Sequence, residues 1–264
     1  FICAKANLWQ GSARSFFETY FEVYAASFNN SRDSFFTGYY EPELEASRSP
    51  KTGFNTPIYA LPDDLITVNL GEFEQGWQGK QLWGRLENKT LKPYWARADI
   101  HTKKLPADII AWANDIDVFF LHIQGSGLLT LDNGQKLRVG FAGRNGRPYT
   151  AIGKPLIEQG ELDAATISMQ SIRTWLSQNP TRAQSIMNLN QSYIFFRVLN
   201  NTQNGDQSSG PIGAHGVALT AKHSLAVDPS YWHYGLPLFI SAEHPNAQSK
   251  LNQLMIAQDT GSAI

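Results

Sequence analysis

The chain has 264 residues, a formal net charge of −1, 42% hydrophobic and 17% charged residues, a composition typical of a folded protein with room for two domains. Its Lys and Arg residues form no basic stripe, which argues against a nucleic-acid partner, and no run of about 20 apolar residues could span a bilayer. One cysteine, Cys3, and six separated histidines provide neither an internal disulfide nor a metal-ligand pattern, so we expect no metal and no cofactor.

The predicted elements begin with an aromatic helix. Rings recur at helical spacing from Phe16 to Tyr24, and Ser15 with Glu18 fits a capping box, so we expect a helix up to about Ala26. A turn at 29–33 then leads into an aromatic strand at 34–40.

Residues 42–120 are rich in Pro, Gly and short apolar runs. They predict strands at 56–62 and 65–70, a loop or exposed hairpin at 71–84, a helix-like segment at 106–113 and a buried strand at 118–123. An Asn-Gly turn at 133–134 predicts a hairpin that joins 128–131 to 136–141.

The remaining sequence changes from helices to short strands. Helices are expected at 151–160, 168–176 and 181–188, followed by a strand at 192–198 and a flexible loop at 200–210. Short apolar runs at 217–219, 224–227, 237–242 and 254–257, separated by Gly and Pro, favour a small β-barrel. The fold class is therefore mainly β with short helices (β/α+β).

Several polar residues invite a catalytic interpretation. Ser126 lies between glycines but lacks the Gly-x-Ser-x-Gly spacing of a nucleophile elbow, so a tight strand exit is favoured. His122 on the predicted strand is read as a core residue. Asp259 follows an apolar strand, and two roles stay open: a desolvated proton donor, or a carboxylate that holds a turn through backbone N–H groups.

Seven segments together resemble one family, the membrane-bound lytic transglycosylase A family (MltA). They occur in family order over nearly the whole chain, which makes the ordered set far more specific than any single motif. The segments are Phe36-Thr37-Gly38-Tyr39-Tyr40-Glu41-Pro42, His122-Ile123-Gln124-Gly125-Ser126-Gly127, Ala142-Gly143-Arg144-Asn145-Gly146, Ile152-Gly153-Lys154, Ser168-Met169-Gln170, Asn190-Gln191-Ser192-Tyr193-Ile194-Phe195-Phe196 and Gln258-Asp259-Thr260-Gly261-Ser262-Ala263-Ile264.

The resemblance implies a fold, a reaction and a location. It implies a double-psi-like β-barrel, here residues 1–41 and 198–264 and incomplete at the C-terminus, with a β-rich domain, 42–197, inserted into it. The implied reaction cleaves the β-1,4 bond between N-acetylmuramic acid and N-acetylglucosamine in peptidoglycan, leaving a 1,6-anhydro ring. The implied location is the periplasmic face of a Gram-negative outer membrane, reached through a lipid anchor that this chain does not contain.

The resemblance also implies a groove between the two domains. Its residues by family match are Thr37, Gly38, Tyr39, Tyr40, Gln124, Gly125 and Ser126, with Asp259 as a supporting carboxylate. The principal aspartate of the family follows the segment on which this sequence ends, so it is expected beyond Ile264, and this exact chain is expected to be inactive if truncated. Two alternatives stay open: a non-catalytic glycan-binding module, and a hydrolytic glycosidase in which Glu41 or Glu43 faces Asp259.

Overall fold

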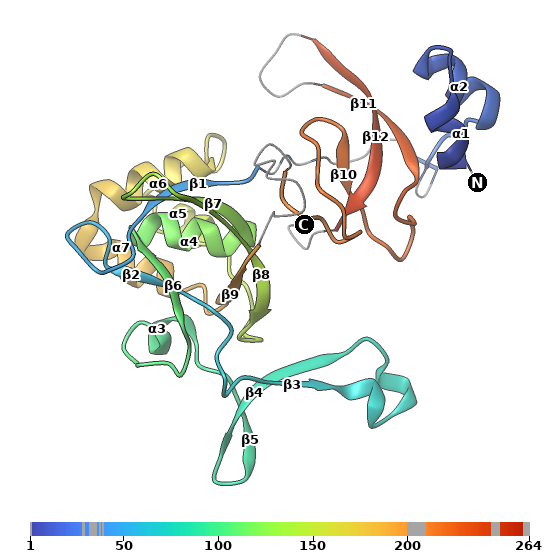
Figure 1. Ribbon diagram of the computed structural model, residues 1–264. Helices are drawn as coiled ribbons and strands as arrows, with labels where there is room; N and C mark the ends of the chain where they lie inside the picture. The colour runs from blue at the N-terminus through green and yellow to red at the C-terminus, as the bar shows by residue number, and fades with distance from the viewer. Residues whose placement is uncertain are drawn as a thin grey trace. The chain divides into compact units, whose positions relative to one another are not determined.

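The computed structural model describes residues 2–27, 30–31, 36, 38, 40–199, 210–243 and 249–260. The chain divides into two compact units, Phe1–Tyr39 and Tyr40–Ile264, whose helices and strands are labelled in Figure 1.

The first unit contains α1 (Ile2–Leu8) and α2 (Ala13–Tyr20). The predicted capping box is wrong, because Ser12 is the N-cap and accepts a hydrogen bond from the N–H of Ser15, while Glu18 pairs with Arg14. The helix also ends earlier than predicted, since Phe21 is already extended. The predicted turn at 29–33 and strand at 34–40 lie largely outside the described residues.

A four-stranded sheet forms the centre of the second unit, in the order β1 (Glu43–Ala46), β7 (Ser126–Leu131), β8 (Lys136–Arg144), β9 (Ile194–Val198). β1 runs parallel to β7, whereas β7 and β8 form the predicted antiparallel hairpin. Gly134 has a φ of 78° in the turn, a conformation that favours glycine. Leu44, Leu129 and Val139 lie in the core of this sheet.

Helices cover this sheet, and one of them corrects a prediction. α4 (Asp115–Gln124) is a helix where the sequence predicted a strand at 118–123. Asn114 caps its start by accepting a hydrogen bond from the N–H of Ile116 at 3.0 Å. All residues from Val118 to His122 are buried, so the apolar run has no amphipathic period that would reveal a helix.

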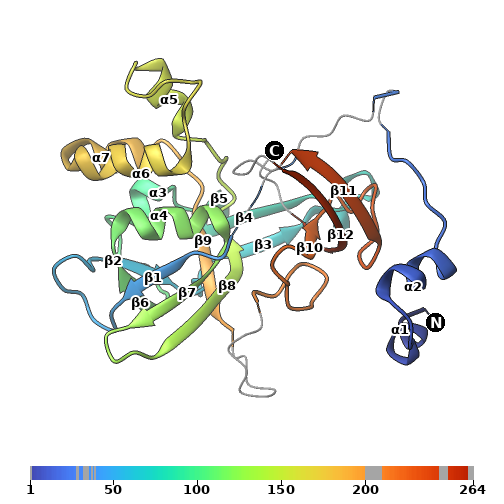
Figure 2. The ribbon, with the colours of Figure 1, turned by 90° about the horizontal axis from the view of Figure 1, so that it is seen from above.

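The predicted helices at 151–160, 168–176 and 181–188 are confirmed as α5 (Gly153–Glu158), α6 (Met169–Gln178) and α7 (Pro180–Asn188). Figure 2 shows α4, α6 and α7 on one side of β1, β7 and β8. Phe119 and Phe120 of α4 pack with Leu156, Trp175 and Leu176 in a second core cluster.

A smaller sheet pairs β2 (Thr56–Tyr59) with β6 (Ile109–Ala113). β6 corrects the helix-like prediction for 106–113, because pairing with β2 satisfies its backbone in an extended form. Next to it lies α3 (Arg97–Ile100), whose Ile100 packs with Tyr94 and Tyr193 in a third core cluster.

Strands β3 (Ile66–Asn69), β4 (Gln81–Glu87) and β5 (Thr90–Pro93) form an antiparallel sheet, which we call the arm. The predicted hairpin at 71–84 corresponds to the connection of β3 to β4, which includes two 3₁₀ turns, η1 (Leu70–Glu72) and η2 (Gln75–Trp77). Figure 1 shows the arm extending away from β2 and β6.

The last sheet has the order β10 (Ser224–Ala226), β12 (Lys250–Asp259), β11 (Pro237–Glu243). The strands predicted at 224–227, 237–242 and 254–257 are confirmed, whereas 217–219 contributes only an isolated bridge between Ala218 and Ile212. The mainly β character with short helices is also confirmed. A closed barrel stays a prediction, because these three strands describe an open sheet. No described helix is both long and apolar enough to cross a bilayer.

Candidate functional site

The parallel pairing of β1 with β7 brings two of the predicted groove segments to one edge of the central sheet. Parallel strands start at the same edge, so the residues that precede β1 lie beside those that precede β7. The carbonyl of Pro42 accepts a hydrogen bond of 2.9 Å from the N–H of Leu128. Pro42, at the end of the aromatic segment, therefore lies beside Gly127 and Leu128, which directly follow the α4–β7 junction, Gln124 to Ser126.

Gly125 stops α4 and starts β7. It is the C-cap of α4 with φ 77°, and its N–H donates to the carbonyl of Leu121 at 2.9 Å. The sequence predicted glycines at a strand exit, but the structure uses this one as a helix stop. The turn leaves Gln124 and Ser126 half-buried on either side of it.

Gly127 is required for a close approach. A Cβ atom here would lie 2.5 Å from Leu121 Cδ1 and 3.0 Å from the Pro42 carbonyl oxygen. Its lack of a side chain therefore lets the β1 entrance and α4 pack against the same point of β7.

Replacing Gly125 by alanine is expected to lower the free energy of unfolding by about 1 kcal/mol, because a Cβ is strained at positive φ. Gly76→Ala is the matched control, because the φ of Gly76 is not positive and no atom lies within 4 Å of an added Cβ. Urea denaturation of both variants measures the difference. Equal midpoints for the two variants would contradict the helix-stop role.

Tyr40 lies against the helical layer. Its hydroxyl donates to Met169 Sδ of α6 at 3.5 Å, and 45% of the residue is exposed. Gly38 is described without regular secondary structure and has open space where a Cβ would stand. Thr37 and Tyr39 lie outside the described residues.

The three carboxylates after the aromatic segment are either held in an ion pair or exposed to solvent. Glu41 forms a bidentate ion pair with Arg138, at 2.8 Å to Nε and 3.0 Å to Nη2, and both side chains are largely buried. Glu43 and Glu45 alternate with buried residues on β1 and face solvent, as expected for the exposed face of a strand.

A buried arginine lies directly behind the α4–β7 junction. Arg97 is 1% exposed and donates from Nε to the Asn190 carbonyl (3.0 Å), from Nη2 to the Ser192 carbonyl (2.6 Å) and from Nη1 to His122 Nδ1 (2.9 Å). Burial lowers the pKa of Arg97 to about 10, which still leaves it charged at neutral pH. Arg97 thus ties the last turn of α4 to the segment before β9.

His122 is a neutral core residue, as the sequence indicated, although it lies on a helix. Because Arg97 donates to Nδ1, the ring proton is assigned to Nε2, which is buried without a hydrogen-bond partner in the described residues. Burial, and next the charge of Arg97, hold the pKa of His122 well below its usual value. The rings of Tyr193 and Phe196 pack on it at centroid distances of 4.0 and 5.6 Å.

Asn145 also belongs to the buried hydrogen-bond network behind the α4–β7 junction. It is fully buried, and its side chain donates to the carbonyls of Trp95 and Gln191 and accepts from the N–H groups of Tyr193 and Arg147. Two of the seven motif segments therefore act here as scaffold. The sequence did not reveal Arg97, because nothing in the local run Ala96-Arg97-Ala98-Asp99 distinguishes it from an exposed arginine.

Asp259 lies at the end of β12. Its Oδ1 accepts the N–H of Ala214 at 2.9 Å, and its carbonyl accepts the N–H of Val227 at 2.9 Å. One carboxylate oxygen thus holds a turn, which is the second of the two roles left open by the sequence. Within the described residues, no three His, Cys, Asp or Glu side chains cluster as a metal site.

Comparisons with known proteins agree with this architecture. The MltA specific insert domain matches residues 35–197, and the 3D domain matches residues 223–264. Membrane-bound lytic murein transglycosylase A of Escherichia coli K12 is 31% identical over 239 residues, or 87% of this chain and 56% of the relative.

Solved structures give the same result. MltA from Neisseria gonorrhoeae, in a monoclinic form, has a TM-score of 0.74 and 36% identity, covering 86% of this chain and 63% of that one. E. coli MltA with bound chitohexaose has a TM-score of 0.66 and 27% identity, covering 86% and 61%. The chain spans little more than half the length of its curated relatives. Because the insert-domain match covers more than half of the chain and the fold agrees, the chain belongs to the MltA family.

Proposed function

We propose that this chain is part of a lytic transglycosylase that cleaves the β-1,4 bond between N-acetylmuramic acid and N-acetylglucosamine in peptidoglycan. The observation that carries the proposal is the contact of Pro42, at the end of one family segment, with Gly127 and Leu128, at the end of another, in the region that the family's insert domain matches. The E. coli relative is named a murein transglycosylase, and E. coli MltA is described with bound chitohexaose. Both names support a glycan as the substrate class.

In the proposed reaction, an aspartic acid protonates the glycosidic oxygen and its carboxylate then takes the proton of the sugar's 6-hydroxyl, which attacks the anomeric carbon. Because the nucleophile belongs to the substrate, proximity replaces an activated water. We assign Thr37, Gly38, Tyr39, Tyr40, Gln124, Gly125 and Ser126 to substrate binding and Asp259 to a supporting role. By this proposal, residues 42–197 form one domain and residues 1–41 with 198–264 form the other.

The same proposal places the protein at the periplasmic face of a Gram-negative outer membrane. The curated relatives of E. coli and Vibrio cholerae are named membrane-bound, and we propose a lipid anchor for the full-length protein.

Two alternatives differ in their products. A non-catalytic glycan-binding module is favoured by the turn-holding hydrogen bond that Asp259 accepts from the N–H of Ala214, and it would release nothing from murein. A hydrolase would release reducing ends, but it needs a second carboxylate to activate water. Glu41 suits that role poorly, because Arg138 holds both of its oxygens.

The test is mass spectrometry of the products released from purified murein sacculi by the full-length protein. We expect 1,6-anhydro ends; reducing ends would establish the hydrolase, and no products would favour the binding module. Thr37→Val and Asp259→Asn are expected to reduce the turnover of murein with small changes in Tm. An Asp259→Asn variant that mainly loses stability would assign Asp259 to turn-holding alone.

The same product analysis applied to residues 1–264 tests where the principal aspartate lies. Anhydro products from these residues alone would show that the reaction needs no aspartate from outside this sequence.

A further inference from the structure

One face of the arm is polar along its whole length. In the β3–β4 register, Asn69 pairs with Gln81 and Thr67 pairs with Trp83. These four side chains share a face because alternate residues of a strand point the same way, while Ile66, Val68 and Leu82 occupy the opposite face. This face therefore presents two amides, a hydroxyl and an indole in two alternate rungs of the ladder.

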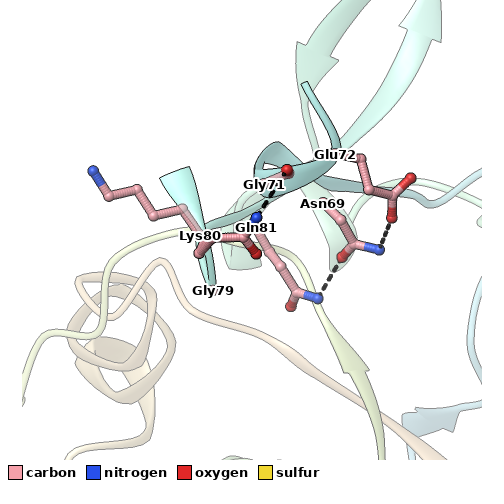
Figure 3. Close-up of a pocket in the computed structure, with 7 residues that line it drawn as sticks. Asn69, Gly71, Glu72, Gly79, Lys80 and Gln81 are labelled. Carbon is pink, nitrogen blue, oxygen red and sulfur yellow. Dashed lines mark hydrogen bonds between the residues drawn. The ribbon is translucent and has the colours of Figure 1, made fainter. Parts of the chain in front are cut away.

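A pocket of about 320 Å³ opens at the end of this face. Its lining, drawn in Figure 3, consists of Asn69, Gly71, Glu72, Gln78, Gly79, Lys80 and Gln81. Its polar side chains are joined in a row: Gln81 Nε2 donates to Asn69 Oδ1 (2.7 Å), and Asn69 Nδ2 donates to Glu72 Oε1 (2.8 Å). This row orders the amides before any ligand arrives.

Two glycines shape the wall of the pocket. A Cβ on Gly71 would lie 2.8 Å from Gln78 Oε1, so its absence allows the Gln78 amide to enter and donate to the Gly71 carbonyl at 3.2 Å. Gly79 has φ 76°, which reverses the chain between Gln78 and Lys80.

The row leaves both hydrogen-bond donors and a hydrogen-bond acceptor unused at the pocket. Each of the side-chain amides of Asn69, Gln78 and Gln81 uses one of its two N–H groups in these hydrogen bonds, and the other has no partner in the described residues. The Oε1 atom of Gln81 has no partner there either. Carboxamides offer a donor and an acceptor without a charge, which suits hydroxyl and acetamido groups. The charges disfavour an anionic ligand, because the Glu72 carboxylate lines the pocket and Figure 3 shows the Lys80 ammonium pointing away from the amides.

Exposed rings stand at the same end of the arm. Phe73 and Trp77 are 75% and 41% exposed, in the connection that forms the pocket. Aromatic faces are apolar surfaces on which sugar rings can pack, and an indole adds a polar edge.

We propose that the end of the arm is a second glycan-binding site, specific for N-acetylglucosamine-containing strands and separate from the α4–β7 junction. The choice of this sugar rests on the proposed function, whereas the presence of a neutral, hydroxyl-binding pocket rests on the arm itself. The arm would hold the murein strand at a point remote from the bond that is cleaved, and so raise the local concentration of substrate.

The experiment titrates the whole chain with chitohexaose and follows the side-chain amide signals by ¹H–¹⁵N NMR. We expect shifts of the Asn69, Gln78 and Gln81 signals in the wild type, and at least tenfold weaker binding, followed at the remaining Gln78 signal, in the Asn69→Ala/Gln81→Ala variant. The matched control is Gln184→Ala/Asn188→Ala, which removes another amide pair, joined at 3.0 Å on α7. The control is expected to retain the wild-type shifts.

The outcomes separate this inference from the proposed function. Shifts confined to the backbone of 124–126 would overturn the arm site and leave the murein activity standing. Shifts at the arm in a full-length protein that yields no anhydro products would sustain the arm site and overturn the activity. Because the double variant could disturb the hairpin, Gln81→Glu, which keeps the shape and removes the donor, is titrated in parallel. Unchanged arm shifts in both variants would also overturn the proposal.

Discussion

Replacing Arg97 by leucine is expected to lower the free energy of unfolding by about 3 kcal/mol. The variant leaves three buried acceptors without a donor: the carbonyls of Asn190 and Ser192, and His122 Nδ1. Each buried unsatisfied group costs about 1–3 kcal/mol. Removing a desolvated guanidinium returns part of that cost, which is why the expected loss is smaller than the sum.

The measurement is the urea midpoint at constant m-value. Arg48→Leu is the control, because Arg48 is exposed and contacts Ile110 and Gln135 at 3.5 and 3.3 Å; its expected effect is within about 0.5 kcal/mol. If Arg97→Leu is as stable as this control, the buried network contributes nothing to the insert domain.

Acidification from pH 7 to pH 5 is expected to remove about 2 kcal/mol of stability through His122 alone. The pKa of His122 is well below 6.5 in the folded state because of burial and the nearby Arg97 charge. In the unfolded state the ring takes up a proton near pH 6.5, so the unfolded form binds more protons below that pH. Stability is therefore full above pH 6.5 and falls as the pH decreases below it.

The comparison is between wild type and His122→Gln, whose carbonyl can still accept from Arg97 but cannot titrate. We expect the pH profile of the variant to be flatter by up to 1.36 kcal/mol per pH unit below pH 6.5. His101, which is exposed, is present in both proteins, so its contribution to the slope cancels in the difference. Parallel profiles would show that His122 is protonated, or reaches water, in the folded state.

Local signals in the sequence predicted much of the insert domain. The Asn133-Gly134 turn identified the β7–β8 hairpin, and periodic apolar residues identified α5, α6 and α7. The prediction failed at α4, because a helix buried on all sides has no polar face. It also failed at Ile109–Ala113, where pairing with Thr56–Tyr59 overrides local preference.

The candidate site was only partly predictable for a different reason. The motifs named Gln124, Gly125 and Ser126, but not that a parallel β1–β7 pair sets Pro42 beside the residues that follow them. Arg97 was missed because its partners at 122, 190 and 192 are remote in sequence. Periodicity and spacing report neighbours along the chain, and such a network exists only after folding.

The parallel pairing of Glu43–Ala46 with Leu128–Leu131 also bears on the order of folding. During synthesis, β1 leaves the ribosome long before β7 does. Its backbone hydrogen-bonding groups therefore stay without their β7 partners until that strand has been made. The β7–β8 hairpin, by contrast, closes on its own within microseconds. We expect this hairpin to form early and β1 to dock late, with loop-closure entropy making that docking the slow step.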